Sequence, residues 1–328
     1  MIGWNDIYIV LAAMFPLYVA LILGYGSVKW WHMFNSDHCD AINRLSCYFI
    51  MPLFTFDFTT RIDPYKMNYR FIAADIISKA IILLAIFLWA NLTKKGNYPW
   101  SITCFSLASL NNTLVVGVPL MAAMYGPVGE NLVIQSSILQ FMIWIMILLV
   151  MLEFQRVKGS LDPGVSTLES GTNCERSNME DTSNKGSSLL VLTKTVGIKI
   201  TKNPNSYACV LGLFWALISN RWNLEMPIIV KGSVEIMSRA GAGIAMFCMG
   251  LFMAMQGKMI ECSAKLAVFG MVLRFMVAPG TMAVGSLAVG LRGDVLRVAI
   301  IQAALPQAIG SFTLAKEYGL HANLLSTG

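Results

Sequence analysis

Charged residues are scarce in this chain of 328 residues, at 13% of the sequence, while 56% of the residues are hydrophobic. The three histidines, His32, His38 and His321, are isolated, and no HExxH or GxSxG pattern occurs. The seven cysteines include no CxxC pair, which argues against a zinc site or a redox motif. These absences argue against an enzyme and against a soluble metal-binding domain.

A cleavable leader is also lacking, because no basic segment with a small-residue cleavage site precedes the first apolar run. Apolar runs near the roughly 20 residues that span a bilayer recur along the chain. They predict an all-α polytopic membrane protein with spans at 7–25, 41–58, 70–90, 101–124, 130–152, 205–219, 228–256, 266–291 and 296–314. The span 228–256 is long and contains Ser233, Glu235 and Arg239, so it is read either as one helix or as two pieces.

The segment 155–194 is rich in Ser, Gly, Asn and charged residues and contains no aromatic residue, which is typical of a flexible loop. It divides the chain into a first membrane repeat, 1–154, with five spans and a second, 195–328, with four. Since the first half has an odd number of spans, a repeat of it must be inverted in the membrane. The fifth span of the second half is expected where the sequence stops, at Gly328, so a tenth helix is missing from this prediction.

The two halves contain similar short sequences after each proline-containing break. Ala122 to Gly126 reads AAMYG and Ala315 to Gly319 reads AKEYG, and an Asn-Leu pair follows each. This similarity favours an internal repeat. The net charge of +6 is explained by Lys and Arg in cytosolic loops and needs no nucleic acid, and counting them by alternate loops puts the N-terminus outside and the central loop in the cytosol.

Residues 111–119, Asn-Asn-Thr-Leu-Val-Val-Gly-Val-Pro, interrupt an apolar span with tandem amides, a glycine and Pro119. Such a break frees backbone groups, which at bilayer depth require protein or water as partners. It is either a transporter site built on a discontinuous helix or a simple proline kink. Residues 304–310 contain the same residue types, namely Pro306, an amide and a glycine. We therefore expect the two broken helices to cross, so that the N-termini of the half-helices present N–H groups to an anionic ligand.

Several polar residues of the other spans complete this picture. Asp75 and Lys79 are four residues apart, so they share one helix face and can pair inside the membrane, either as a proton site or as a static pair. Gln140 can hydrogen-bond that pair or the broken helix, or hold two helices together. In the eighth span, Arg274 is expected to snorkel to the interface or to pair with Glu235. Met51 and Thr55 offer an apolar wall with one hydroxyl, although Met51 also fits plain core packing.

The chain resembles the PIN-FORMED auxin efflux carriers of plants over essentially its whole length. The resemblance rests on the segments Pro16–Gly24 (PLYVALILG), Cys39–Arg44 (CDAINR), Asn112–Val115 (NTLV), Lys202–Tyr207 (KNPNSY), Met246–Met253 (MFCMGLFM), Arg292–Asp294 (RGD) and Ala303–Gln307 (AALPQ). It implies a bundle of two inverted five-helix repeats with crossed broken helices, similar to bile-acid symporters and antiporters, and export of the indole-3-acetic acid anion by an elevator movement.

Carried onto this sequence, the resemblance implies substrate contacts and a support site. The substrate contacts are Met51, Thr55, Asn112, Leu114 and Ile309, and the support site is Asp75, Lys79 and Gln140. Ile145 stands where the family usually has a tyrosine, which leaves the support site one hydroxyl short.

The short central loop resembles that of family members in the endoplasmic reticulum membrane, with a lumenal N-terminus. The resemblance also implies a homodimer without a bound cofactor. We therefore expect a carrier of auxin and related aromatic carboxylates, working as a uniporter driven by the membrane potential. The alternatives are a proton-coupled organic-anion carrier that uses Asp75, and an auxin-binding regulatory protein that does not transport.

Overall fold

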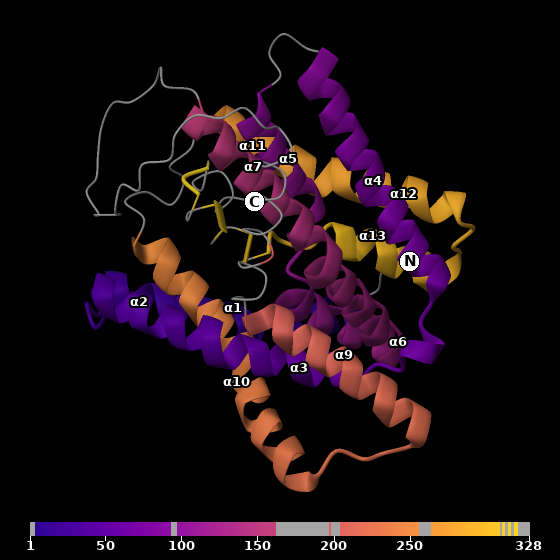
Figure 1. Ribbon diagram of the computed structural model, residues 1–328. Coiled ribbons are helices and arrows are strands. Elements are labelled where there is room, and N and C mark those ends of the chain that lie inside the picture. Colours follow the sequence, from indigo (N-terminus) through magenta and orange to yellow (C-terminus); the bar gives the residue numbers. More distant parts are fainter. Residues whose placement is uncertain are drawn as a thin grey trace, which may run out of the picture.

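A computed structural model describes residues 4–92, 97–161, 197, 204–255, 264–308, 310–311, 314–315 and 318–320. In these ranges the chain is helical throughout, with turns and short links and no β-strand, and two residues form an isolated antiparallel bridge, Asn111 with Gln307. The all-α fold class predicted from the sequence is confirmed. Figure 1 shows long helices running side by side, with most of the links short.

The helices of the first half follow the predicted spans closely. They are α1 (Trp4–Lys29), α2 (Ser36–Leu45), α3 (Met51–Thr60), α4 (Tyr69–Leu92), α5 (Tyr98–Ser109), α6 (Val118–Leu139) and α7 (Ile145–Leu161). Inside α6, Gly126 has the non-helical angles φ 61° and ψ −152°. The kink at this residue separates the fourth predicted span from the fifth. Helix α7 continues to Leu161, past the predicted start of the loop at Gln155, and the rest of that loop lies outside the described residues.

The second half contains α9 (Pro204–Trp222), α10 (Ile228–Met255), α11 (Ala264–Val272), α12 (Ala278–Ala288) and α13 (Gly293–Ala303). The suggestion that residues 228–256 form two pieces is wrong, since α10 is one helix. Its polar residues do not break it, because Ser233 bonds the carbonyl of Ile229 one turn back and Arg239 pairs with Glu235 at 2.7 Å on an exposed face.

Three prolines inside the bundle are each preceded by a π-helical turn. The turns η1 (Ser46–Ile50), η3 (Thr113–Gly117) and η5 (Leu273–Val277) lie just before Pro52, Pro119 and Pro279. Proline has no N–H and its ring clashes with the carbonyl four residues back, so an ordinary α-helix would be strained there. In each case the residue before the proline bonds the carbonyl five residues back, and this wider turn accommodates the ring without ending the helix.

Five described segments are long and apolar enough to span a membrane: Ile7–Lys29, Tyr69–Leu92, Thr113–Arg156, Ile228–Met255 and Lys265–Ala288. The remaining predicted spans correspond to the shorter helices α2–η1–α3, α5, α9 and α13. Large apolar side chains on the outer faces are exposed, such as Phe15 at 68% and Phe87 at 64%. Exposed faces of this kind suit a lipid environment rather than water.

Close helix pairs divide the bundle into two neighbouring groups. In one, α1 packs along α10 and α3 along α9, and in the other α4 packs along α12, which also contacts α13. Figure 1 shows α1, α2, α3, α9 and α10 together in the lower part, below α4, α5, α12 and α13. The pairing of α1 with α10 is especially close, because Gly24 faces the backbone of Phe247 and Gly250 faces the backbone of Leu21.

Substituting Gly250 with alanine should weaken the α1–α10 pair, because the added Cβ would overlap the carbonyl oxygen of Leu21. We expect a loss of about 1–3 kcal/mol in the free energy of unfolding, typical of overpacking. The measurement is thermal unfolding of the purified protein in detergent micelles. The control is Gly243→Ala in the same helix, where a Cβ meets nothing within 4 Å, so its Tm should be unchanged or higher. Equal Tm values for the two variants would contradict this packing.

Candidate functional site

The first helix break lies at residues 110–112. Helix α5 ends at Ser109, Leu110 is extended with φ −104° and ψ 111°, and Asn112 with φ −79° and ψ 66° precedes η3. Pro119 lies within the first turn of α6, beyond the π turn, so it does not lie in the unwound segment as the predicted crossover had it. Gly117 is required for close approach, since a Cβ there would lie 2.7 Å from Cδ1 of Leu305.

The second break follows α13. Ala304 ends the helix with φ −88° and ψ 1°, and residues 305 to 308 are not helical. Pro306 lies inside this unwound segment, as predicted. Ile309, a predicted substrate contact, lies outside the described residues.

The two breaks meet and pair with each other. The N–H of Asn112 donates to the carbonyl of Pro306 at 2.8 Å, and the N–H of Ala308 donates to the carbonyl of Leu110 at 3.2 Å. This is the antiparallel bridge centred on Asn111 and Gln307. Backbone groups released by one broken helix are thus satisfied by the other, as a low-dielectric environment requires.

Side-chain amides extend this pairing. Asn111 donates from Nδ2 to the carbonyl of Gln302 at 2.7 Å, and Gln307 donates from Nε2 to the carbonyl of Ser106 at 3.0 Å. The amide of Asn111, at the first break, therefore bonds α13, which leads into the second break. The amide of Gln307, at the second break, bonds α5, which leads into the first break. All four residues are buried.

Gln140 holds the first break from the side. Its Oε1 accepts from the N–H of Asn111 at 2.9 Å, and its Nε2 donates to the carbonyl of the same residue at 2.6 Å. The amide of Gln140 thereby pairs with both backbone groups of Asn111, as the backbone of a neighbouring strand would. Of the partners suggested for Gln140, the structure shows the broken helix and not the Asp75–Lys79 pair.

The predicted pair in α4 is formed and almost fully buried. Lys79 Nζ lies 3.0 Å from Asp75 Oδ2, and the two residues are 4% and 2% exposed. Trp144 Nε1 donates to the same oxygen at 3.1 Å, and the ammonium lies 5.2 Å from the Trp144 ring. Trp144 is thus a further member of this site, beside Ile145, where the family usually has a tyrosine. Gln140 and Trp144 bound the turn η4 (Gln140–Trp144), which links this pair to the crossing.

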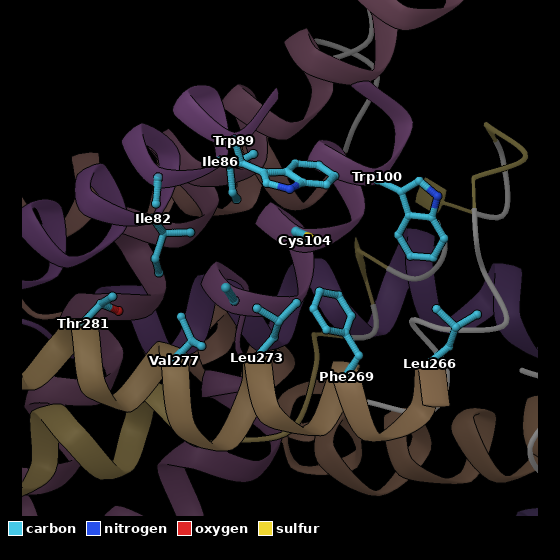
Figure 2. Close-up of a pocket in the computed structure, with 12 residues that line it drawn as sticks. Ile82, Ile86, Trp89, Trp100, Cys104, Leu266, Phe269, Leu273, Val277 and Thr281 are labelled. Atoms are coloured by element: carbon cyan, nitrogen blue, oxygen red, sulfur yellow. The ribbon is translucent and has the colours of Figure 1, made fainter. Parts of the chain in front are cut away.

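An apolar cavity of about 560 Å³ opens between α4, α5 and the α11–η5–α12 segment. Figure 2 shows Phe269 and Leu273 pointing across it toward Trp89 and Ile86, and Leu266 facing Trp100. Its lining contains no charged residue and includes none of the predicted substrate contacts. The cavity suits hydrocarbon and offers no cation for a carboxylate.

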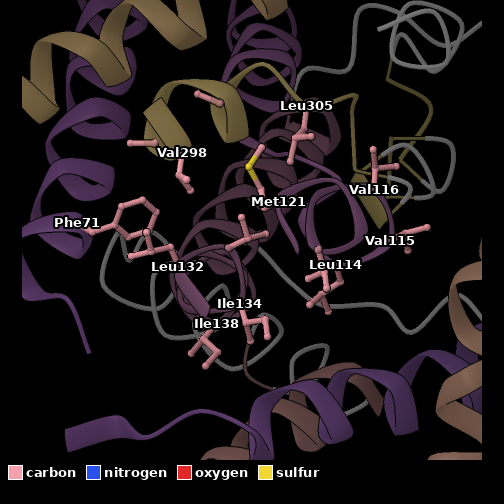
Figure 3. Close-up of a cluster of buried hydrophobic side chains, with 14 of the residues drawn as sticks. Phe71, Leu114, Val115, Val116, Met121, Leu132, Ile134, Ile138, Val298 and Leu305 are labelled. Carbon is pink, nitrogen blue, oxygen red and sulfur yellow. The ribbon is translucent and has the colours of Figure 1, made fainter. Parts of the chain in front are cut away.

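The described substrate contacts lie around one apolar cluster next to the first break. Leu114 is 5% exposed and belongs to this cluster, and Met51 packs against it from α3. Figure 3 shows Leu114 beside Ile134 and Ile138, with Met121 next to Leu305. Thr55 is buried in α3 and donates to Asn205 Oδ1 at 3.3 Å.

Asn112 differs from the other amides at the crossing. It is 7% exposed, and its side-chain amide has no hydrogen-bond partner among the described residues. The N–H groups of Leu114 and Val115, at the start of η3, likewise have no acceptor in the described part of the chain. An anion is the kind of ligand that such a half-helix N-terminus binds.

Arg274 was placed wrongly by both expectations, since it neither snorkels nor pairs with Glu235. It is 0% exposed, and Glu235 pairs with Arg239 instead. Its Nη1 and Nη2 donate to the carbonyls of Leu107 and Pro306 at 2.8 Å each, and its Nε donates to the carbonyl of Leu305. Its position about two to three turns into an apolar stretch without an acidic neighbour was a signal that sequence reasoning did not use.

Comparison with known proteins identifies relatives along the whole chain. A family described as membrane transport proteins matches residues 9–328. The chain is 56% identical over 327 residues to auxin efflux carrier component 5 of Arabidopsis thaliana, covering 100% of this chain and 93% of that protein. It is 50% identical over 339 residues to probable auxin efflux carrier component 5a of Oryza sativa subsp. japonica, with 100% and 93% covered. It is 34% identical over 346 residues to auxin efflux carrier component 8 of Arabidopsis thaliana, with 100% and 94% covered.

Replacing Gln140 with leucine should destabilise the crossing, because the N–H and the carbonyl of Asn111 would both lose their partner in a buried site. Leaving a buried polar group unpaired costs about 1–3 kcal/mol, so two such groups predict a large loss of unfolding free energy. Thermal unfolding in detergent measures it. Met142→Leu is the control, because Met142 belongs to the same π turn but is 36% exposed and makes no such bond. A Gln140→Leu variant as stable as Met142→Leu would disprove the bridging role.

Proposed function

Because the chain belongs to the auxin efflux carrier family of membrane transport proteins, we propose that it moves the indole-3-acetic acid anion across a membrane by alternating access. Membership of this family makes it a carrier and not an enzyme, as the sequence indicated. The named relatives are auxin efflux carriers, which supports auxin as the substrate.

The observation that supports this function most strongly is the side-chain amide of Asn112 beside the N–H groups of Leu114 and Val115, none of which has a hydrogen-bond partner in the described part of the chain. A substrate carboxylate placed there receives hydrogen bonds from all three groups and from the positive end of the half-helix. The indole ring of the substrate then packs on Leu114 and Met51, which border the same apolar cluster.

The charges around the crossing also favour an anion. Asp75 compensates the charge of Lys79, to which it is paired, but all partners of Arg274 among the described residues are backbone carbonyls. This leaves one positive charge in excess in a low-dielectric region, which raises the local concentration of an anionic substrate. Thr55 and Ile309 complete the proposed substrate contacts.

For the movement we propose an elevator built on two inverted repeats. Gly126 and Gly319 end the two similar AAMYG and AKEYG segments, and both have positive φ, 61° and 66°. Such matching backbone geometry is expected of structural repeats. The group with α4, α5, α12 and α13 contains the breaks and would move against the group with α1, α3, α9 and α10.

We further propose the endoplasmic reticulum membrane as the location, with a lumenal N-terminus, a cytosolic central loop and a homodimeric assembly. The short loop between the halves and the Lys and Arg count support this orientation. Transport then runs from the cytosol to the lumen, and the uniported anion responds to the membrane potential with about 2.3 kcal/mol per 100 mV.

Asn112→Ala should abolish the amide contact with the carboxylate. A hydrogen bond to a charged group contributes about 1.5–3 kcal/mol of binding free energy. Its loss should therefore raise KM for auxin roughly 10- to 100-fold. Uptake of labelled indole-3-acetic acid into reconstituted vesicles measures this. Asn91→Ala is the control, because Asn91 is exposed and, among the described residues, bonds the carbonyl of Phe87 within its own helix. The proposed site is refuted if the Asn112 and Asn91 variants transport equally well.

Uniport and proton coupling through Asp75 predict different driving forces. We expect flux in vesicles to follow an imposed membrane potential at equal pH on both sides, and to ignore a pH gradient at clamped potential. A flux that tracks the pH gradient would instead support proton coupling. Saturable auxin binding without flux would support the regulatory, non-transporting alternative.

A further inference from the structure

Arg274 is the most completely buried cation among the described residues, at 0% exposure. It lies in η5, on the helix that packs against α5, and all its hydrogen-bond partners there are backbone carbonyls. A buried guanidinium without a carboxylate is costly unless fixed dipoles replace its water shell. The three carbonyls must therefore provide that replacement.

One of these carbonyls lies at the end of a helix, and the other two lie in the unwound segment beyond the second helix. Leu107 lies in the last turn of α5, and Leu305 and Pro306 directly follow α13. The final carbonyls of a helix lack intrahelical partners and carry the negative end of its dipole. The carbonyl at the end of α5 and the two unwound carbonyls beyond α13 all direct partial negative charge at Arg274, and a cation between them removes their mutual repulsion.

The guanidinium suits this position because its Nε, Nη1 and Nη2 donate in different directions from one plane. One of its acceptors, the carbonyl of Pro306, also accepts from the N–H of Asn112. Arg274 is therefore connected to the proposed substrate residue through a single shared carbonyl. Its position affects the backbone on which the proposed substrate site is built.

We propose that Arg274 is a tethered cation that holds the crossing closed, occupying a carbonyl-lined position that would otherwise take a free monovalent cation. It is a positioning residue, and its effect on transport rests on the proposed function. With this cation covalently fixed, the crossing needs no inorganic ion to stay paired. Removing the side chain should create a binding site for a small planar cation.

The test is chemical rescue of Arg274→Ala in the purified full-length protein. The variant should have a lower Tm and should lose auxin flux, and guanidinium at millimolar concentration, far below denaturing levels, should restore both in a saturable manner. Urea, which is planar but neutral, should restore neither. Arg274→Lys should have a Tm and an auxin flux between those of the parent and Arg274→Ala, because lysine keeps the charge but cannot donate in the three fixed directions of the guanidinium. Replacing Na⁺ and K⁺ by choline should leave the Tm of the parent protein unchanged.

Arg239→Ala is the matched control, because Arg239 is exposed and pairs only with Glu235 within its own helix. Guanidinium should not change its Tm or flux. The proposal is overturned if Arg274→Met keeps the parent Tm and flux, or if guanidinium helps Arg274→Ala no more than urea does. If Arg274→Ala is recovered folded neither with nor without guanidinium during purification, the proposal also fails. Absence of flux in the parent protein would instead refute the proposed function, while the Tm measurements still decide the role of Arg274.

Discussion

Unpaired backbone groups at bilayer depth are the constraint on which this structure depends. Breaking a helix inside a membrane releases N–H and carbonyl groups that hydrocarbon cannot satisfy. This chain breaks two helices and lets each satisfy the other, through the Asn112 and Ala308 hydrogen bonds. Gln140 and Arg274, from two other helices, then pair both backbone groups of Asn111 and the carbonyls of Leu107, Leu305 and Pro306, which leaves the N–H groups of Leu114 and Val115 for a ligand. The crossing can exist only because these four contributions are present together.

A second consequence is that the crossing and the buried ion pair are connected. Gln140 contacts the first break, and Trp144, one π turn later on the same element, donates to Asp75. A change in the Asp75–Lys79 pair would therefore be transmitted along η4 to the backbone of Asn111. This coupling gives the ion pair a structural route to the proposed substrate site, whichever driving force the carrier uses.

The sequence allowed the membrane class, the helix positions and the meeting of the two breaks to be predicted, since these depend on hydrophobic length and on Pro, Gly and amide residues. The Asp75–Lys79 pair also followed from i,i+4 spacing. The extent of the break did not, because the predicted break ran from Asn111 to Pro119, whereas the chain unwinds at the tandem asparagines and the π turn absorbs Pro119. Arg274 and Trp144 have partners on other helices, which local spacing cannot reveal.

The π turns before Pro52, Pro119 and Pro279 have one more consequence. A π turn contains one residue more than an α turn, and one residue corresponds to about 100° of rotation around the helix axis. Each of these prolines therefore marks a change of phase, after which a different side of the same helix faces the protein. A single 3.6-residue period therefore does not run through the whole span. The buried and exposed faces of each segment, before and after the proline, should be assigned on separate helical-wheel projections.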